Sequence, residues 1–449
     1  MNVNIRKFAA VLPLVLIFVF AGFGQSGKID NITEQAALVT EFDVNGLKVL
    51  VKRRPSAPTV AAGLFIRGGA RNINPKNAGI ESLTLSAAVE AGTAFPRAAL
   101  RRELSKTGSG ISAGSNKDFS VISFASTRQN FDRLWNVFTD VSINPAFTPE
   151  DVQRVRGQIL AGLRENETSP DSALQAFQDR VIYAGHPYAN DVNGNVANIG
   201  SFTPADLRAY HKNLMQTSRL LLVVVGDVDP NELKAKIAAS FGKLPRGTYK
   251  EQPLPAIDFS KGSVDISPRS IQTNYIQGIF AAPSLSNPDY FAMRVATTIL
   301  QQMVYEEVRV KRQLSYAPSA DLNNNAANTA NIYVTAVDAN QAVKVMLEQI
   351  DELKSGEIDQ AAIDGMAGQF LTNYYLGQET NAAQAAELAR YELIGGGWRN
   401  AFEFLNHIRE VKSADIQTVA RKYMKNIRFV VVGNPQAVDK NVFLAAARP

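Results

Sequence analysis

Two stretches of the chain, about 200 residues apart, repeat one pattern. In residues 206–226 and again in 415–433, a polar residue begins an amphipathic helix, and an apolar β-branched run then ends on glycine. Helical periodicity followed by such a run predicts a helix and then a buried strand. Self-similarity over so long a period predicts two copies of one structural plan. The 449 residues are enough for each copy to have its own core.

The elements expected within each half alternate between strands and helices. Asn-Gly at 45–46 separates two alternating apolar segments and predicts a tight hairpin, which a strand over about 59–67 and a helix over about 77–91 follow. Thr-Pro pairs at 148–149 and 203–204, each followed by acidic residues, predict helix starts. We therefore predict α+β domains, each a largely antiparallel sheet with helices packed on one face.

A segment without clear periodicity separates the two halves. Residues 243–262 contain three prolines among charged and polar residues, a composition typical of an exposed interdomain linker. The predicted domains are an amino-terminal domain over 38–242 and a carboxy-terminal domain over 263–445.

The amino terminus has the order of a secretory signal peptide. Within residues 1–24, Arg6 and Lys7 precede an uncharged apolar run from Phe8 to Phe23, which is short for a membrane span of about 20 residues. We expect cleavage before Gln25 and export to the periplasm, with a retained membrane anchor as the alternative. After cleavage we expect no membrane association.

Composition excludes several kinds of site. The chain has no cysteine, so disulfides, thiol nucleophiles, iron–sulfur clusters and cysteine-ligated zinc are impossible. Its three histidines, His186, His211 and His407, lie far apart, and none has a second histidine at helical spacing. Lys and Arg total 47 against 42 acidic residues, with the excess spread along the chain, so we expect no nucleic-acid partner.

Two glycine-rich motifs suggest chemistry but have simpler interpretations. Residues 110–114 fit the G-x-S-x-G pattern, which marks a nucleophile only on a strand-to-helix turn. They follow a predicted helix and enter an alternating run, so we predict a loop leading into a strand. Residues 395–398 lack the Lys-Ser/Thr of a phosphate-binding loop, so we predict a break between helices.

A series of short motifs resembles, in the same order, the pitrilysin/insulinase family of zinc metallopeptidases. The resemblance covers nearly all of residues 38–445 and rests on the segments 68–71, 77–80, 90–93, 144–147, 185–188 and 223–227. It implies tandem α+β domains that form one half of a peptidase clamshell.

The chain departs from this family at the metal-binding helix. Family peptidases carry H-x-x-E-H there, with two zinc-binding histidines and a catalytic glutamate. Aligned on Gly79, this chain has Ser82, Leu85 and Ser86 at those positions, and the match over 158–163 places the family's third ligand at Gly162.

One extra residue before Gly92 leaves the register of this helix open by one position. No histidine occurs between residues 1 and 185, so neither register restores the motif. The resemblance thus implies a degenerate metal site, and we expect no cofactor in this chain.

The second half keeps a motif that the resemblance connects with substrate. Residues 307–316 are similar to the family segment that places an arginine and a tyrosine seven residues apart, here Arg309 and Tyr316. In the family these side chains bond substrate backbone and help to stabilise the tetrahedral intermediate. A surface arginine beside a core tyrosine is the alternative, and residues 299–303 lack the family's usual glycine-containing turn.

Together these features predict a non-catalytic, substrate-binding subunit of an exported heterodimeric zinc metallopeptidase. A partner with H-x-x-E-H would supply zinc, and peptides or unfolded segments would bind partly by adding a strand to a sheet edge. A structural or binding protein of the same fold with no peptidase role is the alternative, and a hydrolase that uses another site is a third.

Overall fold

The computed structural model describes residues 32–445, so the predicted signal peptide lies outside the described residues. The first half contains a six-stranded sheet with the strand order β1-β2-β6-β3-β5-β4. The bounds are β1 Val39–Val44, β2 Leu47–Arg53, β3 Thr59–Arg67, β4 Gly110–Ser115, β5 Phe119–Thr127 and β6 Leu220–Gly226. All neighbours are antiparallel except β2 and β6.

The second half contains a five-stranded sheet with the strand order β7-β11-β8-β10-β9. Its strands are β7 Ser263–Pro268, β8 Asn274–Ala281, β9 Ser319–Leu322, β10 Thr329–Ala336 and β11 Arg428–Gly433. Only β7 and β11 are parallel, as β2 and β6 are in the first sheet. Without β1, the first sheet has the same order and directions, so the repeated plan is confirmed.

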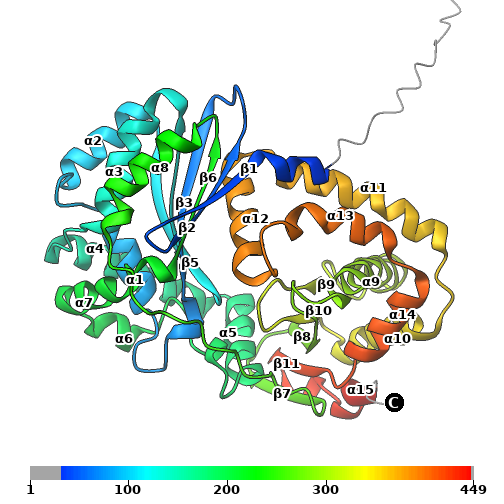
Figure 1. Cartoon of the computed structure of the whole chain (residues 1–449). Coiled ribbons are helices and arrows are strands. Elements are labelled where there is room, and N and C mark those ends of the chain that lie inside the picture. Colours follow the sequence, from blue (N-terminus) through cyan, green and yellow to red (C-terminus); the bar gives the residue numbers. More distant parts are fainter. Residues whose placement is uncertain (1–31, 446–449) are drawn as a thin grey trace, which may run out of the picture.

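Helices pack around both sheets (Figure 1), as an α+β fold requires. In the first half they are α1 Ile80–Ala88, α2 Arg97–Thr107, α3 Phe131–Ile143, α4 Pro149–Thr168, α5 Pro170–Ile182, α6 Val196–Ser201, α7 Pro204–Leu214 and α8 Pro230–Ala239. In the second half they are α9 Asp289–Val304, α10 Ala339–Ser355, α11 Gln360–Gly377, α12 Asn381–Ile394, α13 Asn400–Glu410, α14 Ser413–Tyr423 and α15 Lys440–Leu444. No helix within residues 32–445 combines the length and hydropathy that a bilayer crossing needs.

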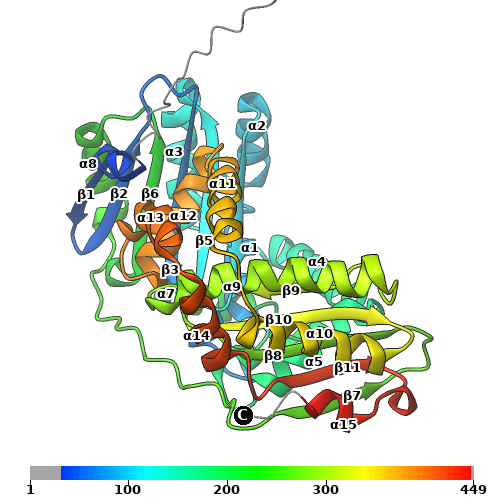
Figure 2. The same cartoon turned by 90° about the vertical axis from the view of Figure 1, so that its right-hand side faces the viewer.

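The two halves exchange one helix each. Helix α12 of the second half packs on β3 and β6 of the first sheet, and α5 of the first half packs on β8 and β11 of the second (Figure 2). Apolar side chains of the first sheet, such as Phe65 and Val223, therefore belong to the core of the second half. This exchange joins the two halves through both sheets.

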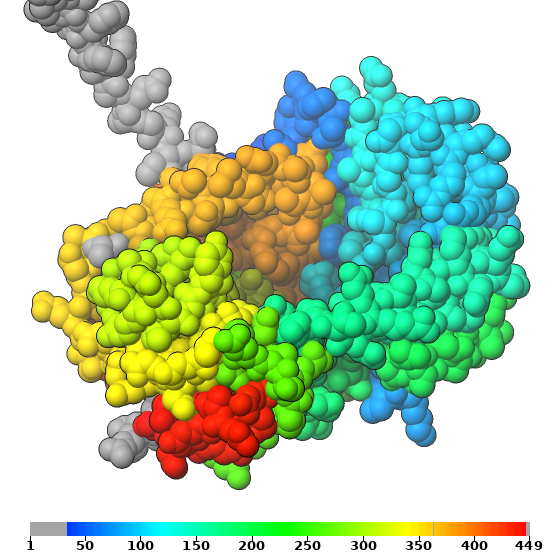
Figure 3. Space-filling view, turned by 180° about the vertical axis from the view of Figure 1, so that it is seen from behind, coloured from blue at the N-terminus to red at the C-terminus, as the bar shows by residue number. Residues whose placement is uncertain are grey.

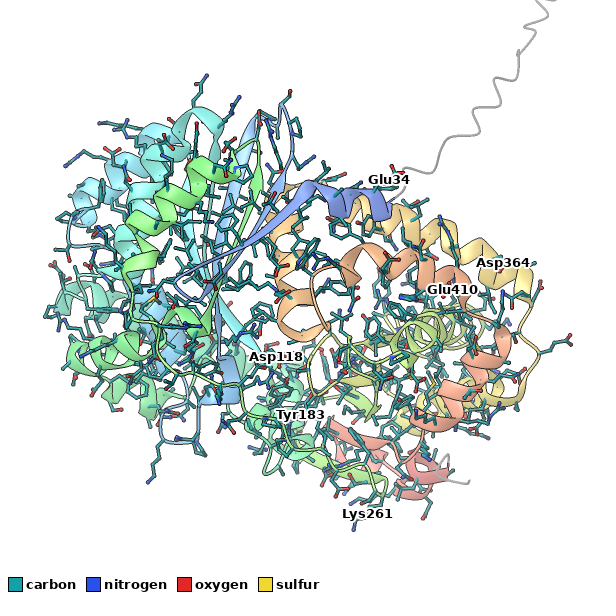
Figure 4. The ribbon with its side chains drawn as sticks, viewed as in Figure 1. Glu34, Asp118, Tyr183, Lys261, Asp364 and Glu410 are labelled. Atoms are coloured by element: carbon teal, nitrogen blue, oxygen red, sulfur yellow. The ribbon has the colours of Figure 1, made fainter. Side chains whose placement is uncertain are left out.

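Polar contacts also join the halves where they meet. The buried Asp118 carboxylate accepts hydrogen bonds from the Ala326 backbone N–H at 3.0 Å and from the Tyr188 hydroxyl. The Tyr183 hydroxyl lies 3.3 Å from that of Thr329, and Figure 4 shows Asp118 and Tyr183 at this junction. Because buried donors and acceptors are costly when unpaired, these contacts favour one relative arrangement of the halves.

The local signals in the sequence explain the element boundaries. Asn45 and Gly46 both have positive φ, at 52° and 83°, as the tight β1–β2 turn requires. The Thr148 and Thr203 side chains accept hydrogen bonds from backbone N–H groups in the first turns of α4 and α7, as predicted. Helix α1 is shorter than the predicted 77–91, because Gly79 has φ 92° and forms a left-handed N-cap.

The segment between the two sheets is largely exposed but is fixed at several points. Glu251 pairs with Arg67 at 3.0 Å and with Arg71, and the Tyr249 hydroxyl accepts a hydrogen bond from the Asn72 side chain at 2.9 Å. These contacts attach the segment to the loop that leads into α1.

Candidate functional site

Helix α1 carries the positions at which the family resemblance places metal ligands. Ser82 and Ser86 lie one turn apart and are half-buried, and Leu85 is buried in the core against the first sheet. The Ser82 hydroxyl lies 3.2 Å from the side-chain oxygen of Asn193. On α4, a Cβ added at Gly162 would meet no atom within 4 Å.

These positions do not fit a zinc ion. Serine hydroxyls are poor zinc ligands at neutral pH, and leucine and glycine offer no donor side chain. Within residues 32–445, no group of three or more His, Cys, Asp or Glu side chains is arranged to hold a metal.

A buried carboxylate, which the sequence analysis missed, holds the start of α1. The side chain of Glu81 accepts hydrogen bonds from the Gly69 backbone N–H at 2.8 Å, from the Ser120 hydroxyl, and from the Tyr210 hydroxyl at 2.7 Å. Arg219 lies 3.6 Å from the same carboxylate. Burial, together with the nearby Glu81 charge, raises the pKa of Tyr210, so that its hydroxyl stays a donor. Four elements are thereby attached to α1.

An open sheet edge lies beside α1. Helix α1 packs next to β4, which is the last strand of the first sheet and pairs only with β5 within the part of the chain that the structure describes. The G-x-S-x-G motif forms this strand itself, whereas we predicted a loop leading into a strand, and its Ser112 hydroxyl lies 3.4 Å from that of Ser123. The motif therefore does not form a nucleophile elbow, which needs a strand-to-helix turn.

A cavity of about 350 Å³ opens next to this edge. Its floor is made by small side chains of β3, β4 and β5, including Gly63, Ser112 and Ser123, and Ala385 of α12 contributes to its wall. Phe65 and Val121 make its lining mostly apolar. Figure 3 shows this side of the molecule, hollowed between the orange α12 region and the cyan strand region.

The structure brings Arg309 and Tyr316 together at the surface of the second half. Arg309 lies in a π-helical segment, Tyr305–Lys311, that continues α9. Its guanidinium donates to the Tyr316 backbone oxygen at 2.8 Å and lies 4.2 Å from the centre of the Tyr316 ring. Tyr316 is 78% exposed, so the alternative of a core tyrosine is wrong. Three residues later β9 begins, the edge strand equivalent to β4.

The remaining sequence candidates have structural roles. His186 is buried, and its Nδ1 accepts a hydrogen bond from the Tyr188 backbone N–H at 3.1 Å. His211 is buried 2.9 Å from the Ser142 carbonyl oxygen. Residues 395–398 form the predicted break between α12 and α13.

Comparisons with known proteins give one consistent family. The family described as "Insulinase (Peptidase family M16)" matches residues 48–195, and the one described as "Peptidase M16 inactive domain" matches residues 201–370. The mitochondrial-processing peptidase subunit beta of Saccharomyces cerevisiae is 21% identical over 422 residues, which cover 88% of this chain and 90% of that protein. Subunit 1 of the bovine mitochondrial cytochrome b-c1 complex is 24% identical over 265 residues, 58% of this chain and 55% of that protein.

Solved structures share the fold. A peptidase M16 inactive domain from Pseudomonas fluorescens superposes with a TM-score of 0.78 at 20% identity and covers 88% of this chain and 98% of that one. A protease from Helicobacter pylori gives a TM-score of 0.79 at 16% identity, covering 88% and 99%.

Proposed function

Since the chain belongs to the insulinase family, peptidase family M16, we propose that it is a non-catalytic, substrate-binding subunit of an exported heterodimeric zinc metallopeptidase. One observation carries this proposal: helix α1 is held in place by Glu81 beside the open edge of β4, yet its ligand positions are Ser82, Leu85 and Ser86. The chain thus keeps the frame of a peptidase site without its metal ligands. A partner subunit with an intact H-x-x-E-H would supply the zinc.

We propose that peptide binds along β4. An extended peptide would continue the sheet through backbone hydrogen bonds, which read little of the peptide sequence. The glycine, alanine and serine residues of β4 leave room for a close approach. Alternate peptide side chains would project over Ser112 toward the apolar cavity, which would favour apolar residues at one position.

Arg309 and Tyr316 would support the reaction at the partner's zinc. Guanidinium and phenol groups both donate hydrogen bonds, and the exposed position of Tyr316 leaves its hydroxyl accessible. Aimed at the carbonyl of the scissile bond, such donors would stabilise the oxyanion of the tetrahedral intermediate.

A structural subunit with no peptidase role is the second candidate. The similarity to a cytochrome b-c1 complex subunit favours it, because that protein is named as part of a respiratory complex. The two functions differ in whether turnover of a peptide depends on this chain.

The test is reconstitution with a family member that carries H-x-x-E-H and is encoded next to this chain. We expect the mixture to cleave an unstructured peptide with zinc, and each chain alone to be inactive. Arg309→Ala should lower turnover by about 10²-fold or more if the guanidinium stabilises the oxyanion. Arg312→Ala, directly after the same segment and paired with Glu307, is the matched control and should leave turnover unchanged. Chelator-sensitive cleavage by this chain alone would refute the subunit role.

A further inference from the structure

A lysine at the end of β2 is buried without a carboxylate. The side chain of Lys52 is only 3% exposed, and its Nζ donates to the Gln35 side-chain oxygen at 3.1 Å. Within residues 32–445, no Asp or Glu oxygen lies within 4 Å of this ammonium group. The ammonium also lies 5.1 Å from the centre of the Phe402 ring, but of its three donors only the one to Gln35 is bonded to an oxygen of the described residues.

Lys48, on the same strand, has the carboxylate partners that Lys52 lacks. It lies four residues earlier on the same face of β2, and its ammonium pairs with Glu41 at 3.1 Å and with Glu392 at 2.6 Å. Buried charges are normally paired in this way, because an unpaired one loses its hydration without compensation. Lys52 is therefore the exception that needs an explanation.

The Lys52 side chain lines a cavity of about 550 Å³. Helix η1, Ile32–Leu38, lies beside this region, and Figure 4 marks it by Glu34. Arg54 adds a second cation to the wall, and Leu38, Tyr374 and Tyr375 add apolar and aromatic surface. Glu34 also lies on the lining, so two cations stand against one carboxylate.

The cavity lining has a net positive charge, from Lys52 and Arg54 against Glu34, and this favours an anion. Burial, together with the neighbouring Arg54 charge, lowers the pKa of Lys52 to about 8. An anion near both cations would restore the charged form of Lys52 and remove the cost of burying it alone. The cavity volume lies in the range of small-ligand sites, which is roughly 300–1,000 Å³.

We propose that this cavity binds the carboxy-terminal carboxylate of a peptide, held between Lys52 and Arg54. The aromatic and apolar walls would take the last side chain. Inorganic phosphate would use the two cations but would leave the apolar wall without a partner. The site lies at β2, which is next to the edge strand β1 and separated by three strands from the β4 edge, so it goes beyond the proposed function and does not depend on a catalytic partner.

Calorimetric titration of the purified chain with a short N-acetylated peptide ending in leucine tests the proposal. We expect the free acid to bind at least about tenfold more tightly than the same peptide as its amide, because a charge-assisted contact is lost. Lys52→Met should abolish this preference. Lys48→Met, on the same face of the same strand, should keep it.

Acylation of Lys52 by a trace of acetic anhydride, measured by mass spectrometry, tests the proposal even if Lys52→Met does not fold. The free acid should slow acylation near pH 8 and the amide should not, since only the carboxylate raises the pKa of Lys52. Equal binding of acid and amide, or protection by inorganic phosphate but not by the acid, would overturn the proposal. If the mixture with the partner subunit does not cleave peptide, but this chain still binds the free acid more tightly than the amide, only the proposed function is refuted.

Discussion

The buried carboxylate of Glu81 offers the most direct test of how α1 is held. Glu81→Ala would leave the buried Gly69 N–H without its acceptor and the buried Arg219 guanidinium without its ion-pair partner. A buried unpaired donor costs about 1–3 kcal/mol, and a buried charge that loses its partner costs about 3–5 kcal/mol. The two hydroxyls that also bond Glu81 can rotate toward other acceptors, so we count neither. The two costs overlap, because both follow from removing one carboxylate, so we do not add them and expect the free energy of unfolding to fall by about 3–5 kcal/mol.

Thermal unfolding followed by circular dichroism measures this effect. For a domain of about 200 residues, each kcal/mol shifts the melting temperature by about 2–4 °C, so the decrease should be roughly 6–20 °C. Glu81→Gln keeps one oxygen acceptor and should fall between the native chain and Glu81→Ala. Hydrogen exchange should show the loss of protection first in α1 and β5.

The matched control is Glu150→Ala. Glu150 also lies in the first turn of a helix, α4, but it is exposed, so its removal should cost only the helix-dipole contribution of about 0.3–1 kcal/mol. If Glu81→Ala destabilises the chain no more than Glu150→Ala does, the carboxylate does not hold α1 and our account of the site is wrong.

Three further predictions concern stability. Burial lowers the pKa of His211, so its neutral form is favoured in the folded state. The free energy of unfolding, measured by urea titration, should therefore fall by up to about 1.4 kcal/mol per pH unit as the pH decreases below about 6.5. The variant His211→Gln should make this free energy less dependent on pH. Gly79→Ala should destabilise the chain by about 1–3 kcal/mol, because φ is 92° and the new Cβ would lie 2.6 Å from a neighbouring side chain. Gly162→Ala, at a helical position with open space around it, should stabilise the chain by about 0.5–1 kcal/mol. Melting curves that show the opposite order of stability would contradict this prediction. The buried side-chain amide of Asn381, at the start of α12, donates to the Thr59 carbonyl oxygen at 2.6 Å. Asn381→Ala should therefore increase hydrogen exchange in α12 more than in α13. Equal increases in both helices would contradict this prediction.

Local signals made much of the fold predictable from the sequence. Asn45-Gly46 fixes a turn because both residues tolerate positive φ, and the Thr-Pro pairs fix helix starts because threonine accepts a first-turn N–H. The repeated helix-then-strand pattern predicted two similar domains, and the equivalent strand orders of the two sheets agree with it.

Contacts between distant segments could not be predicted in the same way. The periodicity of α5 and α12 shows that one face of each is buried, but it does not tell which sheet covers that face. An acid in the first turn of α1 normally indicates a favourable helix dipole, so nothing local distinguishes Glu81 from an exposed residue. The isolation of Lys52 likewise depends on where the carboxylates of other segments lie.

The contacts that hold α1 explain how a peptidase fold can persist without its metal ligands. Structural metal sites can contribute much of a domain's stability, and losing them would loosen the helix that carries them. Here α1 is attached to the first sheet, to α7 and to the preceding loop through Glu81, and Leu85 adds to the core. None of these contacts involves Ser82, Ser86 or Gly162. Substitution at those three positions can therefore remove metal chemistry while α1 and the open edge of β4 keep their geometry.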